Sequence, residues 1–411
     1  MLSSDLQQGF LSTGCSRRER LLHQIQTGTK GTLVETVSSP EEEALPEYGL
    51  EFDGSFRGLL PIVLVNLLLT IITLGLYRFW ARTKVRKYLW SSVRLHGDAF
   101  EYTGTGKELF IGFLIVLFLV FLPMGFAFFQ AQIMMETPGR EAQGASLLFG
   151  AYMLMLYLYG VAYYRRNRYR LSRTRWRGIR GKQREGGYRY GFIHFMLTLV
   201  NFMLLGLASP LISNRLWEYE SNRREFGTGR FSYKGRAGPL YKPFAIAVFL
   251  SLLLIAATVT LIIFVIAAVS GGGGATEWLQ QSQANGPKGI YTIVAALFAG
   301  YFLVGLAVAA PVLWYQVRQL RHFWGHSRYE GFPLSFHGRF GDIFRLWLGN
   351  LGIFIATLGL GAPFMEMRWL RFLVEHTRIS GFPALESIGQ AEGADPSLGE
   401  GLAEGFDLGG I

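Results

Sequence analysis

Polar side chains that could bind a solute or carry a proton occur inside long apolar segments of this sequence. Asn66, Thr70 and Thr73 have the i, i+4, i+7 spacing that places side chains on one face of a helix. Polar groups at membrane depth usually face the interior of a helix bundle, where they either hydrogen-bond to a neighbouring helix or line a pathway. The full candidate set, with the glycines near the segment ends, is Asn66, Thr70, Thr73, Gly75, His194, Asn201, Gly206, Asn350, Thr357 and Gly359.

Other chemistry has weak support in the sequence. His194 is the one side chain in the apolar cores that titrates near neutral pH, so it is the candidate proton carrier, and the lack of Asp or Glu there argues against cation-coupled transport. His322 and His326 have the spacing of two metal ligands, and Glu330 could extend that face, but Gly331-Phe332-Pro333 should end the helix by then. Gly104-Thr105-Gly106-Lys107 lacks the earlier glycine of a phosphate loop. We therefore predict no catalytic residue, no metal site and no cofactor.

Arginines at helical spacing form a second candidate site. Arg78, Arg82 and Arg86 make one stripe, and Arg368 and Arg371 make a similar one near the end of the chain. Such segments are typical of amphipathic helices that lie in the membrane interface. The arginines could anchor the protein on its cytoplasmic side, or they could select the head groups of anionic phospholipids.

The segments that carry these residues are copies of one unit. The stretch from Phe52 to Gly97 recurs without a gap between Phe336 and Gly381, and Thr73-Leu74-Gly75 matches Thr357-Leu358-Gly359. A looser copy ends at Leu205-Gly206-Leu207-Ala208-Ser209-Pro210. Such internal similarity indicates that one structural unit has been duplicated.

Composition places these units in a membrane. Half of the 411 residues are hydrophobic and 17% are charged, below the roughly 25% of soluble domains. We predict an all-α polytopic membrane protein with four to seven crossings, since seven apolar blocks approach or exceed the length that crosses a bilayer. These blocks are about 59–77, 109–129, 146–164, 190–212, 244–269, 290–314 and 346–365.

The distribution of positive charge favours a particular topology. The net charge is +11, yet the loops at 130–145 and 270–289 hold only two of the 40 Lys and Arg residues. If the first, fourth and seventh blocks enter and leave on one face, all the other basic residues and both tails are cytoplasmic. If all seven blocks cross, the two sides carry nearly equal numbers of basic residues. Gly and Pro near the ends of the three repeated blocks favour turns there.

A second repeated phrase predicts short strands between the membrane segments. Phe100–Gly104, Phe231–Gly235 and Leu334–Gly338 alternate apolar and polar residues before a glycine, as hairpin strands do. We therefore expect a membrane domain over 51–383, a disordered N-terminal tail over 1–50 and an acidic disordered tail over 384–411. The repeated units of the membrane domain are about 52–104, 188–235 and 336–381, with helix pairs over 109–164 and 244–314 between them.

The segment Phe52–Phe110 resembles the YjgN family of bacterial inner-membrane proteins. The resemblance is carried by Asn66–Arg82 and Gly104–Phe110, and it extends through the repeats to about Gly381, although the middle copy departs from the family pattern. It implies a multi-pass protein of the inner membrane, and the family has no settled biochemical role. We predict a transporter or channel-like protein for a small solute, not an enzyme. The alternative is a non-catalytic lipid-binding or membrane-organising scaffold, with anionic phospholipid rather than nucleic acid as its partner.

Overall fold

The strands form one antiparallel sheet that nearly closes into a barrel. The computed structural model describes residues 46–269 and 287–381, together with residues 276, 280, 283, 284 and 389. The eleven strands follow the order β1-β11-β10-β9-β8-β7-β6-β5-β4-β3-β2. The end strands β1 (Glu47–Gly49) and β2 (Glu51–Phe52) are separated in the chain only by Leu50. One continuous segment therefore pairs with β11 on one side and β3 on the other, and we call this sheet the barrel.

Tight hairpins build most of the barrel. His96-Gly97, Arg177-Gly178 and Glu330-Gly331 each have two positive φ angles, which suit the two-residue turns that match the twist of antiparallel strands. The glycines take this conformation without steric cost. The remaining strands are β3 (Val93–Leu95), β4 (Asp98–Tyr102), β5 (Thr174–Trp176), β6 (Ile179–Gln183), β7 (Arg224–Phe226), β8 (Gly229–Tyr233), β9 (Ser327–Tyr329), β10 (Phe332–Phe336) and β11 (Thr377–Ser380).

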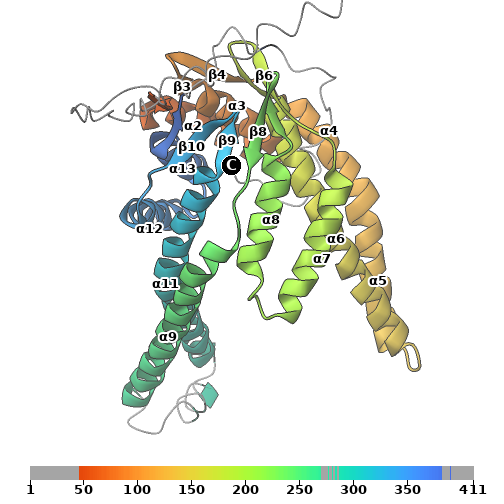
Figure 1. Ribbon diagram of the computed structural model, residues 1–411. Coiled ribbons are helices and arrows are strands. Elements are labelled where there is room, and N and C mark those ends of the chain that lie inside the picture. The colour runs from red at the N-terminus through yellow and green to blue at the C-terminus, as the bar shows by residue number, and fades with distance from the viewer. Residues whose placement is uncertain are drawn as a thin grey trace, which may run out of the picture. The chain divides into compact units, whose positions relative to one another are not determined.

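Helices leave the barrel and return to it in pairs. In the described chain, each helix pair connects two strands that are hydrogen-bonded to each other. These strands are β2 with β3, β4 with β5, β6 with β7, β8 with β9, and β10 with β11. Figure 1 shows the labelled strands gathered at one end of helices α5 to α9 and α11. Both ends of every pair therefore lie on the same side.

Two of these pairs are long enough to cross a membrane. Among the residues that the structure describes, the four candidate spans are Gly106–Glu136, Glu141–Ser172, Gly238–Val265 and Phe298–Gly325. The first contains α4 (Gly106–Val116), the π-helical turn η1 (Leu117–Phe121) and α5 (Leu122–Glu136), and it packs against α6 (Glu141–Ser172). The second pair is α9 (Gly238–Val269) and α11 (Pro287–Gly325).

The three repeated blocks form shorter pairs that turn back. Leu74-Gly75, Leu205-Gly206 and Leu358-Gly359 all have left-handed φ angles, between 50° and 91°, and end the first helix of their pair. Thr73 Oγ1 accepts a hydrogen bond from Tyr77 N at 2.9 Å, and Thr357 Oγ1 accepts one from Gly361 N at 2.8 Å. The pairs are α2 (Phe56–Ile72) with α3 (Arg78–Ser91), α7 (Gly187–Met203) with α8 (Ser209–Ser221), and α12 (Phe340–Thr357) with α13 (Ala362–His376).

The predicted all-α class is wrong. The short strands were expected, but their assembly into an eleven-stranded barrel was not. Strands of two to five residues are too short for a clear alternation pattern, and the closing pairs join Gly49 to Arg378 and Glu51 to Arg94. Glu47–Gly49, assigned from the sequence to the N-terminal tail, form β1. Residues 1–45 of that tail and almost all of the acidic tail lie outside the described residues.

The basic helices form the returning arms of the short pairs. α3 is the returning arm of the first short pair, and it packs against α2 through buried Val85 and Leu89, which contact Leu59 and Val63. α13 packs on α12 in the same way. Their arginines are therefore placed by the packing of each pair, and only some of them remain exposed.

Candidate functional site

A groove between the first short helix pair and α13 collects residues from both predicted site classes. It has a volume of about 230 Å³. Asn66 and Thr70 of α2 line it together with Arg78 and Arg82 of α3, and Glu366 of α13 closes the opposite wall. The remaining lining is mainly apolar: Val63, Leu67, Ala81, Val85, Leu360, Ala362 and Pro363. The groove thus combines two cations, one carboxylate and hydrocarbon surface.

Asn66 brings an unused acceptor to this groove. The side chain is only 5% exposed, and its Nδ2 donates to Ala81 O at 3.2 Å, which fixes the orientation of the amide. Among the described residues, Asn66 Oδ1 has no hydrogen-bond partner. A buried acceptor without a donor is costly, so a ligand that carries a hydroxyl or ammonium group would be stabilised at this point.

The arginine stripe of α3 runs from the surface into the protein. Arg78 is exposed and lies over the rings of Phe79 and Phe113, at 5.0 and 5.2 Å from their centroids. Arg82 is half-buried one turn later, and Arg86 is buried after the next turn. Only the first two line the groove. The stripe therefore offers a cationic path from the groove mouth to the interior.

At its inner end the stripe meets other cations under the barrel. Arg86 interacts electrostatically with Arg166 and Arg170 of α6, and Glu366 lies close enough to Arg170 to act on it as an opposite charge. Burial raises the pKa of Tyr102 on β4, and the nearby Arg86 and Arg170 oppose this rise. Sequence reasoning missed Arg166, Arg170 and Glu366, because their convergence depends on packing between distant helices.

The other polar candidates do not join this groove. Asn201 lies one helical turn closer to its Leu-Gly turn than Asn66 does, and its amide bonds with the Ser209 hydroxyl at 3.3 Å. His194 packs between α6 and α7, with its ring 5.5 Å from that of Tyr159. Asn350 is half-buried on α12, and its Oδ1 has no hydrogen-bond partner among the described residues. The predicted pathway residues are therefore distributed over three separate helix pairs.

The threonines of the candidate set bond within their own helices. Thr70 Oγ1 donates to Asn66 O and Thr73 Oγ1 to Leu69 O, both at 2.7 Å, and Thr357 Oγ1 donates to Ile353 O at the same distance. Gly75, Gly206 and Gly359 supply the left-handed turns. These residues shape the short pairs, and of them only Thr70 lines the groove.

The arginines of the last repeat make contacts within the protein. Arg371 Nη2 donates to Gly54 O, and its guanidinium lies 5.2 Å from the Phe52 ring centroid. Arg368 lies against Gly349, where a Cβ atom would come within 2.3 Å of its Nη2. Both side chains therefore help to pack α13 against its neighbours, in contrast to Arg78 at the groove mouth.

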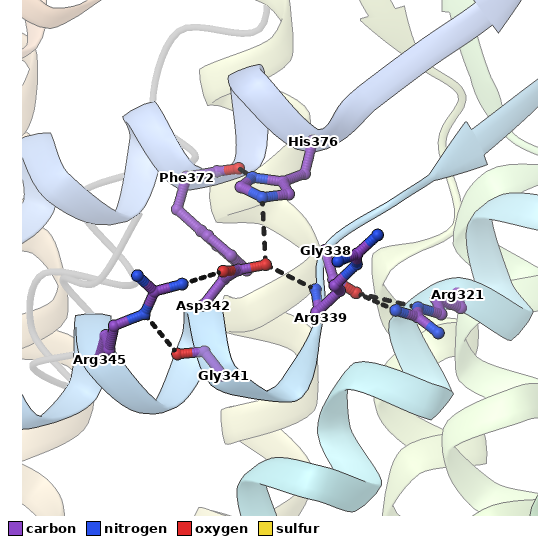
Figure 2. A network of polar contacts seen from close by, with 8 residues as sticks. All are labelled: Arg321, Gly338, Arg339, Gly341, Asp342, Arg345, Phe372 and His376. Atoms are coloured by element: carbon purple, nitrogen blue, oxygen red, sulfur yellow. Dashed lines mark hydrogen bonds and ion pairs between the residues drawn. The ribbon is translucent and has the colours of Figure 1, made fainter.

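A polar network fixes the start of the last helix pair (Figure 2). Asp342 Oδ2 accepts from Arg339 N at 3.1 Å, and Oδ1 accepts from Arg345 Nη2 at 2.7 Å. His376 Nε2 lies 3.6 Å from Asp342 Oδ2. Burial alone would raise the pKa of Asp342, but the hydrogen bonds from Arg339 and Arg345, with the nearby His376, outweigh it and lower the pKa.

Asp342→Asn is therefore expected to destabilise the protein in a pH-dependent way. A carboxylate with a lowered pKa stabilises the fold above its ordinary value of 3.8, and this contribution is lost as the pH falls through the lower pKa of the folded state. We expect Asp342→Asn to lower the free energy of unfolding by about 1 kcal/mol at neutral pH, the typical loss when a side chain that caps a helix N-terminus is replaced. Thermal unfolding from pH 7 downward checks this, with Asp53→Asn, at an exposed ion pair with Arg94, as the control. A difference between Asp342→Asn and the wild type that does not shrink on acidification would contradict it.

Comparison with known proteins finds relatives among bacterial inner-membrane proteins. The model of a family described as bacterial protein of unknown function (DUF898) matches residues 47–405. The inner membrane protein YjgN of Salmonella typhimurium is 25% identical over 369 residues, which cover 81% of this chain and 88% of that protein. YjgN of Escherichia coli K12 is 38% identical over 80 residues, so the matched segment spans a fifth of each chain. No solved structure matches.

Proposed function

Because this chain belongs to the DUF898 family of bacterial proteins of unknown function, we propose a role that rests on its own geometry: a non-catalytic lipid-binding protein. It is an integral protein of the inner membrane, with four apolar helices and relatives named inner membrane protein. Its ligand is an anionic phospholipid in the groove between α2, α3 and α13. The observation that carries this proposal is the placement of Arg78, Arg82 and Asn66 along one largely apolar groove, where Asn66 Oδ1 has no hydrogen-bond partner among the described residues.

Each part of the groove suits a part of the lipid. A guanidinium presents a planar fork of donors to phosphate oxygens, and two of them outweigh the single charge of Glu366. Asn66 Oδ1 can accept from a head-group hydroxyl, as in phosphatidylglycerol. The apolar wall of Leu67, Leu360 and Pro363 can contact acyl chains. Phosphatidylglycerol, which has both the phosphate and the hydroxyls, is therefore the expected ligand.

The helix pairing supports a cytoplasmic position for this groove. Every pair begins and ends at the barrel, so the loops rich in Lys and Arg gather on the barrel side, and the turn between α5 and α6, within the segment 130–145 that is poor in Lys and Arg, lies at the far end of the first long pair. By the positive-inside rule, this distribution favours a barrel on the cytoplasmic side. The short pairs enter the cytoplasmic leaflet and turn back, where anionic head groups attract basic residues.

The double variant Arg78→Gln, Arg82→Gln tests this function. Each arginine near an anionic membrane surface contributes about 1 kcal/mol, so we expect selectivity for phosphatidylglycerol over phosphatidylcholine to fall roughly tenfold to thirtyfold. Native mass spectrometry of protein released from nanodiscs of the two lipids measures the retained species. The matched control is Lys84→Gln, Lys87→Gln, which removes the same charge from exposed positions of the same helix outside the groove.

The controls separate groove binding from general charge attraction. If both double variants lose selectivity equally, the lipid is held by net charge and the groove proposal fails. Asn66→Leu provides a second test, because it removes the acceptor for the head-group hydroxyl. We expect it to reduce retention of phosphatidylglycerol more than retention of phosphatidic acid, whose head group lacks the glycerol.

Transport of an anionic solute is the second candidate function. One observation favours it: the stripe from exposed Arg78 to buried Arg86 continues to Arg166 and Arg170, so cations line a route inward. Uptake of inorganic phosphate into proteoliposomes, lost in Arg86→Gln, would support this role. If protein-free liposomes take up as much phosphate as the proteoliposomes, transport is ruled out by this assay and lipid binding remains the proposed function.

A further inference from the structure

A positively charged pocket lies between the two helices of the second long pair, at the ends that join the barrel. Its volume is about 680 Å³. Lys242 lines it from the start of α9, which follows β8, and Arg318 and Arg321 line it from the end of α11, which leads into β9. The described lining holds no Asp or Glu. The pocket shares no lining residue with the groove, so it is a separate candidate site.

The spacing of the lining residues along both helices places the cations on the side of the pocket. Four of them on α11 have the i, i+4, i+7, i+8 spacing of one helix face: Trp314, Arg318, Arg321 and His322. On α9, Lys242 and Ile246 are four residues apart and share a face in the same way. α12 packs against a different face of α11, through a cluster that contains Leu313 and Val317. The charged face of α11 is therefore left uncovered by α12, and Arg318 and Arg321 are exposed.

Two of the guanidinium groups are held in place by the protein. Arg318 lies over the ring of Trp314, 4.1 Å from its centroid. This contact uses the face of the guanidinium and leaves the N–H groups in its plane available to phosphate oxygens. Arg321 Nε and Nη2 donate to Gly338 O at 2.9 and 2.6 Å (Figure 2). Both cations are thus positioned before any ligand arrives, which reduces the entropy lost on binding.

The pocket cations lack a counter-charge within the described part of the protein. No carboxylate there lies within ion-pair distance of Lys242, Arg318 or Arg321, whereas Arg345 on the neighbouring α12 pairs with Asp342 at 2.7 Å. Like charges around one pocket repel each other, and an anion between them relieves this repulsion. Three cations without a carboxylate favour an anion that carries more than one charge.

We propose that this pocket binds the head group of an anionic phospholipid with two phosphates, as in cardiolipin. Basic pockets between membrane helices bind head groups of this kind. The phosphates lie at Arg318, Arg321 and Lys242, and the acyl chains run along Trp314, Ile246 and the apolar surface of the long pair. The groove, in which Glu366 offsets one of two arginines, suits a single phosphate. The pocket does not depend on the groove, and its test can fail while the groove proposal stands.

The double variant Lys242→Gln, Arg318→Gln tests the pocket. Native mass spectrometry counts the cardiolipin retained by the full-length protein after release from phosphatidylcholine nanodiscs that contain a minor fraction of cardiolipin. We expect the variant to reduce this retention roughly tenfold to thirtyfold. The matched control is Lys234→Gln, Arg328→Gln, which removes the same charge from exposed barrel-side positions outside the pocket and should have little effect. An equal loss of cardiolipin in both double variants would overturn the proposal.

Replacing Trp314 separates the shape of the pocket from its charge. Trp314→Leu keeps every cation but removes the ring that holds Arg318, so cardiolipin retention should fall several-fold. Trp314→Phe restores an aromatic face and should recover most of the retention. If Trp314→Leu retains as much cardiolipin as the wild type, the lipid is held by surface charge and not by this pocket.

Two further arms identify the ligand and its location. Inorganic pyrophosphate carries two phosphates without acyl chains, and in excess it should leave cardiolipin bound to the wild type. Displacement of cardiolipin by pyrophosphate would mean that the pocket recognises a soluble diphosphate, and the lipid assignment would be wrong. The groove variant Arg78→Gln, Arg82→Gln should retain cardiolipin as the wild type does. Loss of cardiolipin from the groove variant alone would place it in the groove and refute the pocket.

Discussion

Replacing Glu220 by glutamine is expected to cost roughly 3–5 kcal/mol of unfolding free energy, the range found when one partner of a buried ion pair is removed. Glu220 is 4% exposed and accepts hydrogen bonds from side chains of three elements. Tyr190 Oη of α7 donates at 2.8 Å, Arg224 Nη2 of β7 at 2.7 Å, and Asn167 Nδ2 of α6 at 3.3 Å. An amide leaves Arg224 without its counter-charge, and it places an NH2 donor against groups that themselves donate.

The same substitution on the same helix provides the control. Glu218 pairs with Arg215 at 3.0 Å on the surface of α8, so Glu218→Gln should change stability by less than about 1 kcal/mol. Unfolding of both variants by sodium dodecyl sulfate in mixed micelles gives the comparison. Similar midpoints for Glu220→Gln and Glu218→Gln would mean that the Glu220 network does not hold α6, α7 and β7 together.

The second large effect is the loss of stability expected when charged residues replace the leucines at the tips of the short helix pairs. Leu74, Leu205 and Leu358 are 94%, 92% and 89% exposed, and all three have φ near 50°, a conformation that bulky residues avoid. In water such a turn would favour Gly or Asn. In the proposed topology each of these leucines contacts lipid, where its apolar side chain lowers the free energy of insertion.

We expect the triple variant Leu74→Asp, Leu205→Asp, Leu358→Asp to be strongly destabilised in a bilayer. Each aspartate costs up to about 3 kcal/mol at the membrane centre and less near the interface. Replacement of all three leucines by methionine keeps the tips apolar and should have little effect. Resistance to unfolding in lipid bicelles is the measurement, and equal resistance of the Asp and Met variants would place the tips in water.

The repeat and its turns could be predicted from the sequence because they depend on local residues. Thr73-Leu74-Gly75 and its copy at 357–359 contain the glycine that a left-handed turn needs and the threonine that bonds across it. The same reasoning identified Asn66, Thr70, Arg78 and Arg82, which line one groove. Their spacing along α2 and α3 identified each set, but the sequence assigned the two sets to different sites, and the packing of the structure brings them into one groove.

The remaining features depend on contacts between distant parts of the chain. The barrel closes through pairs such as Gly49 with Arg378, and no local pattern reports such a pairing. His194 and Asn201 were expected to share a site with Asn66, but α7, which carries them, packs on α6. The amide of Asn201 donates a hydrogen bond to Ser209. The burial of Arg86 beside Arg166 and Arg170 likewise follows from the packing of α3 and α6 under the barrel.

The most direct test of this account concerns the return of every helix pair to one side of the membrane. Single cysteines are introduced in a Cys15→Ser background at exposed positions of four barrel strands or turns, Glu101, Arg177, Thr228 and Glu330, and at the far ends of the long pairs, Arg140 and Gln280. A membrane-impermeant thiol reagent is then added to intact spheroplasts and to inside-out vesicles. The account predicts that Arg140→Cys and Gln280→Cys alone react in spheroplasts and that the other four react in inside-out vesicles. Reaction of any barrel position from outside the spheroplast would show that a helix pair crosses to the opposite side, and would contradict the account.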